Sequence, residues 1–242
     1  MNIILIYFSI KYKGDWDKIY KALEDKEKVS LSEIKSLEDE MKDYPWQVGT
    51  ILDQDYPKKL KEAYKPPFVF WFKGDKKLLN KKYICASGNQ RDKVAVDRVN
   101  KFSKELTKTH NLVTASYKGI DEDILKATSD KSRMFILADG IDKAWLQAKP
   151  TEKDLVFTEY PPECHLTKDT LRNRNRLIAA FADSLVLFSS EKDGPINHLV
   201  TNFLNLGKEI YAFPGDGGDK DGNSELIKQG ANLITKIKDI GC

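Results

Sequence analysis

A chain of 242 residues is long enough for one full α/β domain and a small additional region. Apolar residues make up 40% of the sequence and charged residues 32%, so the chain can bury a core, and a wholly disordered protein is excluded. The net charge of +3 is too small to require a polyanionic partner or to rule one out.

Residues 1–43 are predicted to form a helical region. Apolar residues such as Ile3 and Ile6 recur near the helical spacing, and Asp15 can cap a second helix that begins at Trp16. The charge-rich segment 24–42 carries a thin apolar stripe of Leu31, Ile34, Leu37 and Met41. We expect this segment to be a surface helix over the main core, with a partner-binding helix as the alternative.

Residues 44–67 are interpreted as a connector, because Pro66 and Pro67 disfavour a helix before the aromatic run at residues 68–72. From there to the C-terminus, short apolar runs alternate with amphipathic segments. The apolar runs are residues 83–86, 112–115, 134–138, 155–158, 185–188 and 210–213. The amphipathic segments are residues 93–106, 121–128, 171–182 and 196–206.

This alternation is typical of a mostly parallel sheet covered by helices on both faces. The sequence therefore predicts an α/β fold class: a Rossmann-like, doubly wound, mostly parallel sheet over residues 68–242, preceded by the small N-terminal helical region. In such a sheet, ligands bind in the loops at the carboxyl ends of the strands. Residues 87–91 form one such loop, but GxGxxG and GxxxxGK[ST] are absent, so ordinary dinucleotide or P-loop chemistry is disfavoured.

Two Gly-Ile-Asp motifs follow predicted strands, at residues 119–121 and 140–142. In both we expect the glycine to permit a tight turn and the aspartate to cap the next helix. Glu159 also follows a predicted strand. It is interpreted either as a catalytic acid or, more simply, as an acceptor for loop amides.

Three widely spaced cysteines without a CxxC pair indicate a reducing compartment, so we expect a cytoplasmic protein. Cys164 and His165 offer two metal ligands, but nothing nearby completes a tetrahedral set, and no metal or cofactor is predicted. The apolar opening at residues 1–10 is too short to span a bilayer and lacks the flanks of a signal peptide. No membrane association is expected.

The segment at residues 168–176 is unusually basic, because half of the six arginines lie between residues 172 and 176. Lys168, Arg172, Arg174 and Arg176 precede a helical apolar pattern, and we expect them to converge near the N-terminal end of a helix. Cations there oppose the helix dipole, so phosphate binding explains them better than folding does. The alternative is that the arginines form ion pairs with acids such as Asp169 or Glu159.

An ordered series of short motifs resembles the DNA-processing protein family known as DprA or Smf. The motifs are Lys-Gly-Asp at 73–75, Gly-Ile-Asp at 119–121, Asp-Gly-Ile-Asp at 139–142, Thr-Glu-Tyr-Pro-Pro at 158–162, Arg-Asn-Arg-Leu-Ile-Ala at 174–179, Phe-Pro-Gly at 213–215, Gly-Asn at 222–223, Leu-Ile at 226–227 and Gly-Ala at 230–231. They extend over about residues 55–235, and the Arg-Asn-Arg motif with the later Pro-Gly is the most specific part.

The resemblance implies a Rossmann-like core that binds single-stranded DNA without catalysis. Members of the family protect DNA strands and help to load the RecA recombinase, as in natural transformation, and they usually act as dimers. The implied DNA-binding residues are Lys168, Leu171, Arg172, Arg174, Asn175 and Arg176, with Arg91, Lys118 and Gly119 extending the track. Leu171 stands where the family usually has a phenylalanine.

Some motifs depart from the family pattern. Its Gly-Ser-Arg after the first core strand is Ala86-Ser87-Gly88 here, and Asn89 or Arg91 is the candidate substitute for the arginine. Its Ser-Gly-Ser-Leu-Ile-Thr is replaced by residues 193–198, which carry fewer hydroxyls. Tyr117 and Tyr160 are interpreted as packing residues or as a replacement stacking surface.

Two alternatives stay open. The first is a nucleotide-processing hydrolase on a related sheet, although residues 214–218 lack the Pro-Gly-Gly-x-Gly-Thr order that such enzymes use. The second is a degenerate scaffold that keeps the fold but has lost DNA binding.

Overall fold

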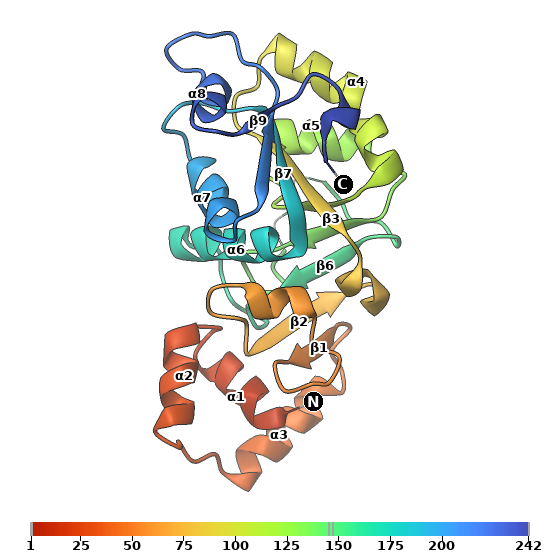
Figure 1. Cartoon of the computed structure of the whole chain (residues 1–242). Helices are drawn as coiled ribbons and strands as arrows, with labels where there is room; N and C mark the ends of the chain where they lie inside the picture. The colour runs from red at the N-terminus through yellow and green to blue at the C-terminus, as the bar shows by residue number, and fades with distance from the viewer. Residues whose placement is uncertain (1, 145, 147, 242) are drawn as a thin grey trace.

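The computed structural model describes residues 2–144, 146 and 148–241. Within these residues nine strands form one sheet in the order β1-β2-β6-β5-β4-β3-β7-β8-β9 (Figure 1). The strands are β1 Gln47–Thr50, β2 Val69–Lys73, β3 Tyr83–Gly88, β4 Asn111–Thr114, β5 Arg133–Ile136, β6 Leu155–Thr158, β7 Ala182–Ser189, β8 Glu209–Ala212 and β9 Asn232–Leu233.

Neighbouring strands from β6 through to β9 are parallel, whereas β2 is antiparallel to β6 and β1 is antiparallel to β2. The chain moves outward from β3 through β4, β5 and β6, and then returns to β7 on the other side of β3. Because of this reversal, the switch point of the doubly wound sheet lies between the neighbouring strands β3 and β7. The predicted Rossmann-like, mostly parallel architecture is confirmed.

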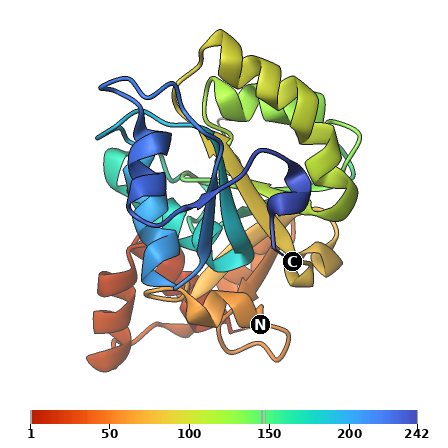
Figure 2. The ribbon, with the colours of Figure 1, turned by 45° about the horizontal axis from the view of Figure 1, so that its top comes forward.

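Helices cover both faces of the parallel part of the sheet (Figure 2). The helices of this part are α4 Lys93–Thr109 and α5 Ile120–Ala127 on one face, and α6 Lys168–Phe181, α7 Asn197–Asn205 and α8 Gly222–Lys228 on the other. Val99 and Phe102 of α4 are buried in the first core, and Leu177 and Phe203 are buried in the second. Each such side chain contributes about 1.5–3 kcal/mol through removal of its apolar surface from water.

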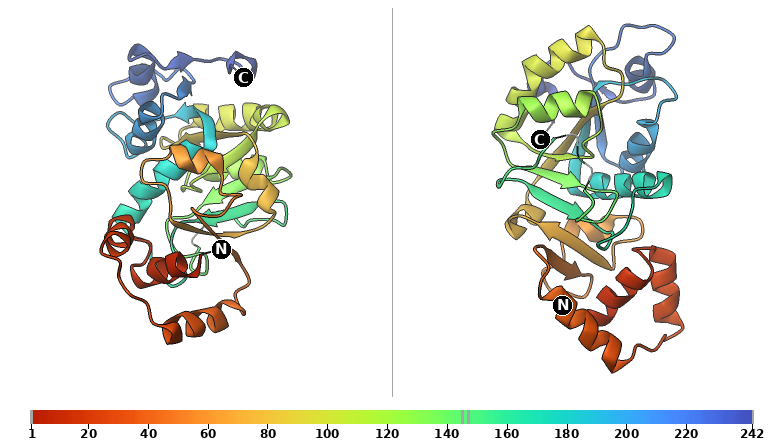
Figure 3. Two further views of the ribbon diagram at one scale, coloured as in Figure 1. Left: turned by 60° about the horizontal axis from the view of Figure 1, so that its bottom comes forward. Right: turned by 180° about the vertical axis from the view of Figure 1, so that it is seen from behind.

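The N-terminal region forms three helices beside the edge strands (Figure 3). They are α1 Ile3–Lys11, α2 Trp16–Glu24 and α3 Leu31–Met41. The side chain of Asp15 accepts a hydrogen bond from the amide of Lys18, so the predicted cap of the second helix is confirmed. Of the stripe on α3 only Leu37 is buried, and it packs with Leu5 and Ile6 of α1. This surface helix therefore covers α1.

Strand β1 lies inside the segment that the sequence predicts to be a connector. Gly49 pairs with Phe70 of β2, and a Cβ on Gly49 would lie 2.3 Å from the Phe70 ring. The glycine that weakens the sequence signal for a strand thus makes room for an aromatic ring of the neighbouring strand. The division into a helical region at residues 1–43 and a core from residue 68 stays a prediction.

A search of the described residues finds no helix with the length and apolarity needed to cross a bilayer.

Candidate functional site

The carboxyl ends of the parallel strands bring several predicted site residues to one edge of the sheet. The loop after β3 contains Arg91, and the loop after β4 contains Lys118 and Gly119. A Cβ on Gly119 would lie 3.9 Å from Cδ of Arg91, so these two loops are in contact. Gly119 has a φ of +96°, a backbone conformation that favours glycine, so the predicted turn is confirmed here.

Asp121 joins the end of β3 to the loop after β4. Its carboxylate accepts hydrogen bonds from Oγ of Ser87 at 2.6 Å and from the amide of Tyr117 at 3.2 Å. The sequence prediction that Asp121 caps the next helix is wrong, because Gly119 occupies the cap position and Asp121 lies buried in the first turn of α5. Burial raises the pKa of Asp121 to about 6, although its hydrogen bonds oppose the rise.

The pKa of Asp121 predicts a pH dependence of stability. Its folded pKa of about 6 lies above the ordinary value of 3.8, so the fold favours the protonated carboxyl. This residue's contribution to the free energy of unfolding is therefore fully present below about pH 4 and falls as the pH rises through about 6. Relative to Asp121→Asn, the wild type should lose on the order of 2 kcal/mol between pH 4 and pH 7. Urea unfolding of both proteins at several pH values measures this, and a difference independent of pH would contradict it.

The second Gly-Ile-Asp motif has a different role from the one predicted. No helix begins within residues 140–144, and Asp142 Oδ1 instead accepts a hydrogen bond from the amide of Glu163 at 3.0 Å. A Cβ on Gly140 would lie 2.6 Å from the carbonyl oxygen of Pro161. The prediction of a capped helix here is therefore wrong: the motif fastens the loop after β5 to the loop after β6.

Helix α6 begins three residues earlier than the pattern predicts. Oγ1 of Thr167 accepts from the amide of Thr170, and the side chain of Thr170 accepts from the amide of Thr167, which together form a capping box. Lys168 and Arg172 are exposed on the first turns, and Leu171 is half-buried. Within the described residues neither cation makes an ion pair or a side-chain hydrogen bond.

Arg174 lies farther along α6 and is buried. Its Nη1 donates to the carbonyl oxygens of Ala115 and Ile136, at 3.1 and 3.2 Å, so it binds the carboxyl ends of β4 and β5. The guanidinium carbon lies 4.8 Å from the centroid of the Tyr117 ring. Nη2 is buried without a hydrogen-bond partner among the described residues. Asn175 Oδ1 accepts from Tyr117 Oη at 3.0 Å and from Arg174 Nε at 3.3 Å.

Arg176 forms an internal ion pair. Its Nη2 lies 2.5 Å from Oε2 of Glu159, and its Nη1 lies 3.0 Å from Oε1. Nη2 also donates to the carbonyl oxygen of Lys65 at 3.1 Å. Burial raises the pKa of Glu159, and the Arg176 charge opposes this rise. Both carboxylate oxygens of Glu159 are thus held by a guanidinium, which is neither a catalytic arrangement nor the predicted contact with loop amides.

The expected convergence of three arginines at the helix start is therefore corrected. Arg172 is exposed on the second turn, whereas the guanidinium groups of Arg174 and Arg176 are turned into the protein, in different directions. The alternative of an ion pair between an arginine and Glu159 is confirmed for Arg176.

Asn89 and Arg91, the two candidate substitutes for the missing family arginine, both have partners within the protein. Asn89 Oδ1 accepts from the amide of Glu191 at 2.9 Å, and Arg91 Nε lies 2.7 Å from Oδ2 of Asp123. Arg91 is nevertheless 56% exposed. Tyr160 is buried, so of its two interpretations the packing role fits.

The exposed basic residues of this edge, together with the half-buried Leu171, form what we call the strand-end surface, which is defined by Arg91, Lys118, Lys168, Leu171 and Arg172. Leu171 lines a small cavity together with Ser116 and Tyr117, which places the start of α6 against the loop that carries Lys118. Lys118 is exposed and makes no ion pair within the described part of the chain. The surface can therefore offer free positive charge to a ligand.

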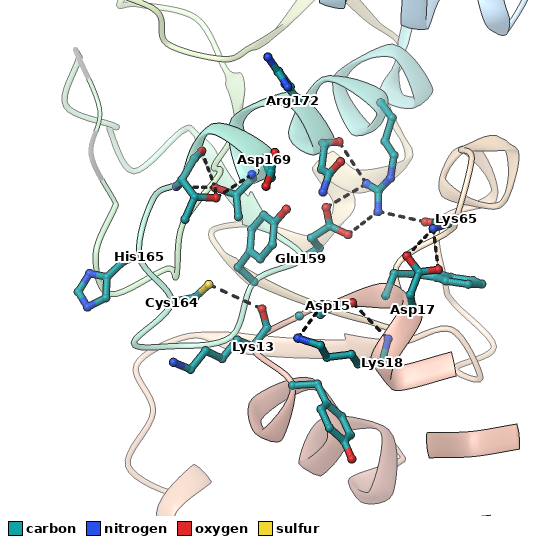
Figure 4. A pocket seen from close by; sticks show the side chains of 18 of the residues that line it. Lys13, Asp15, Asp17, Lys18, Lys65, Glu159, Cys164, His165, Asp169 and Arg172 are labelled. Atoms are coloured by element: carbon teal, nitrogen blue, oxygen red, sulfur yellow. Dashed lines mark hydrogen bonds and ion pairs between the residues drawn. The ribbon is translucent and has the colours of Figure 1, made fainter. Parts of the chain in front are cut away.

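A larger cavity of about 890 Å³ lies on the other side of α6 (Figure 4). It is bounded by the junction of α1 and α2, by Tyr64 and Lys65, by the loop after β6 and by the first turns of α6. Sequence reasoning missed this cavity. The described residues contain no group of three or more His, Cys, Asp or Glu side chains able to hold a metal ion.

Comparisons with known proteins bear on this arrangement. The family model described as DNA recombination-mediator protein A matches residues 47–241. The DNA processing protein DprA of Bacillus subtilis is 30% identical over 207 residues, which cover 78% of this chain and 68% of the relative. The corresponding protein of Streptococcus pneumoniae is 26% identical over 202 residues, covering 79% and 72%.

Solved structures show the same fold. DprA from Streptococcus pneumoniae superposes with a TM-score of 0.75 at 21% identity, covering 98% of this chain and 92% of that one. DNA processing protein A from Helicobacter pylori, whose structure was solved for its single-stranded DNA binding mode, gives a TM-score of 0.67 at 19% identity, covering 81% of this chain and 94% of that one.

Fold, matched family and relatives together define a Rossmann-like protein of DNA processing and recombination. The chain belongs to the DNA recombination-mediator protein A family, also called DprA or Smf. The resemblance drawn from the sequence motifs is confirmed.

Proposed function

We propose that the protein binds single-stranded DNA along the strand-end surface without catalysis, protects the strand and assists the loading of a RecA-type recombinase. The observation that carries the proposal is the exposure of Lys118, Lys168 and Arg172 and their lack of ion pairs within the described residues. Exposed cations without protein partners can neutralise phosphates, and the release of counterions then drives binding.

The site residues divide into two groups in this proposal. Lys118, Lys168 and Arg172 contact phosphates, Arg91 exchanges Asp123 for a phosphate, and Leu171 offers an apolar contact to a base. The second group positions the first: Arg174 and Asn175 hold α6 against the loop after β4, Arg176 holds α6 against Glu159, and Gly119 supplies the turn beside Lys118.

Binding measured over a series of salt concentrations tests this function. With three or four phosphates neutralised, the logarithm of the affinity for an unstructured oligonucleotide should fall with the logarithm of salt with a slope of about −2 to −3. Fluorescence anisotropy gives this slope directly. No measurable affinity at low salt would favour the degenerate scaffold, for which the internal ion pair of Arg176 is the supporting observation.

The remaining parts of the proposal are supported only by the family to which the chain belongs. We expect a cytoplasmic homodimer that speeds the assembly of recombinase filaments on coated strands. Sedimentation of the free protein and filament assembly with and without it test these two points. Release of free base from nucleoside monophosphates would instead support the hydrolase alternative.

A further inference from the structure

The 890 Å³ cavity shares a wall with the strand-end surface, and that wall is the beginning of α6. Thr167, Asp169 and Arg172 line the cavity, whereas Leu171 lies on the opposite side of the helix, toward Ser116 and Tyr117. The volume lies within the range of about 300–1,000 Å³ that is usual for ligand sites. A DNA strand that crosses the first turns of α6 would therefore pass from the strand-end surface into the cavity.

Most acidic groups of the cavity are already neutralised by cations. The pairs are Asp15–Lys18 at 3.2 Å, Asp17–Lys65 at 2.6 Å, Glu159–Arg176 at 2.5 Å and Glu163–Lys143 at 3.0 Å. Figure 4 shows Glu159 near the centre, with Asp17 and Lys65 on one side and Lys13 and His165 on the other. Within the described residues, Lys13 and Arg172 form no ion pair. Of the carboxylates that line the cavity there, Asp169 alone also forms none. The charge left for a ligand is thus positive.

An exposed aromatic ring stands at the edge of this cavity. Tyr64 is 75% exposed, and no hydrogen bond from its hydroxyl is formed within the described residues. Nζ of Lys65 lies 5.5 Å from the centroid of the Tyr64 ring and is held in place by Asp17. An exposed aromatic ring beside a cavity that also holds unpaired cations is the combination that stacks a base and neutralises its phosphate.

We propose that a strand bound on the strand-end surface continues over the first turns of α6 into this cavity, where Tyr64 stacks on a base and Lys13 neutralises a flanking phosphate, with Arg172 contacting the strand where it passes from one site to the other. This inference rests on the proposed function. It assigns the N-terminal helices a share in binding, because Lys13 lies at the junction of α1 and α2. It also supplies the aromatic contact that Leu171 cannot make.

Affinities for oligonucleotides of about 4 to about 16 nucleotides test the inference. Tyr64→Ala should weaken binding of the longest oligonucleotides by about tenfold or more. The affinity for the shortest oligonucleotides that still bind should not change. Tyr64→Phe, which keeps the ring, should restore wild-type affinity. Since Tyr64 is largely exposed, neither change should disturb folding.

A matched pair of lysines provides the control for charge. Lys13 and Lys26 are both exposed and both have a positive φ, of 51° and 52°, but only Lys13 lines the cavity. Lys13→Gln should lower the salt slope for long oligonucleotides by about 0.7, whereas Lys26→Gln should not change it. Photocrosslinking of a long oligonucleotide containing 5-iodouracil should label Tyr64.

The outcomes separate the two proposals. If Tyr64→Ala and Lys13→Gln bind every length as the wild type does, and the crosslink maps elsewhere, the cavity is not part of the path although the proposed function stands. If the wild type binds no oligonucleotide in a salt-dependent manner, both proposals are overturned.

Discussion

Replacement of Arg176 by alanine is expected to lower the free energy of unfolding by about 3–5 kcal/mol. The variant leaves the Glu159 carboxylate buried, with a side chain only 5% exposed, and without its guanidinium partner. It also removes the hydrogen bond to the carbonyl oxygen of Lys65, which ties α6 to the segment before β2. Chemical denaturation monitored by circular dichroism measures the change.

Arg172→Ala is the matched control, because Arg172 lies four residues earlier on the same helix and is exposed. It should change the free energy of unfolding by no more than about 0.5 kcal/mol. The double variant Glu159→Gln with Arg176→Met should be more stable than Arg176→Ala alone, because no buried charge is left unpaired. An Arg176→Ala variant as stable as Arg172→Ala would show that the ion pair does not form in solution.

Reversal of two charges, Lys118→Glu together with Lys168→Glu, is expected to weaken binding of single-stranded DNA by about 100-fold or more at low salt. The change removes two phosphate contacts and adds two repulsive charges at the same surface. Both side chains are exposed and form no ion pair within the described residues, so stability should be nearly unchanged. Anisotropy titrations measure the affinities.

Lys82→Glu with Lys108→Glu provides the same change in net charge elsewhere. Lys82 precedes β3 and Lys108 lies in the last turn of α4, so both are at the amino-end edge of the sheet. This control should lose far less affinity. Equal losses in the two double variants would mean that net charge, rather than the strand-end surface, governs binding.

The parallel part of the fold could be predicted from the sequence because its signal is local. Each buried parallel strand is a short apolar run, and residues 155–158 were predicted with the bounds that β6 has. Strand β1 could not be predicted in this way. Its four residues include Gly49. Only a residue without a Cβ leaves room there for the ring of Phe70, which lies twenty-one residues later in the sequence.

The site was predicted in part for the same reason. The basic residues of α6 can be recognised in the sequence. Whether Arg174 and Arg176 are buried depends on their partners Ala115, Ile136 and Glu159, which lie on other elements. One signal was available. At about 100° per residue, positions 174 and 176 point about 160° apart on a helix and cannot both face one groove.

The large cavity had no sequence signal. Lys13, Tyr64 and Arg172 come from three segments that meet only when the N-terminal helices lie beside the start of α6. A lysine in a turn and a tyrosine in a loop are individually unremarkable, and only their placement around one cavity suggests a role.

The salt dependence of single-stranded DNA binding by Lys168→Gln tests the central claim most directly. Loss of one phosphate contact should make the slope of log affinity against log salt less steep than the wild-type slope by about 0.7, with a weaker affinity at every salt concentration. Parallel salt titrations of the two proteins give both quantities. A variant with the wild-type slope and affinity would show that the cation at the start of α6 does not hold the strand.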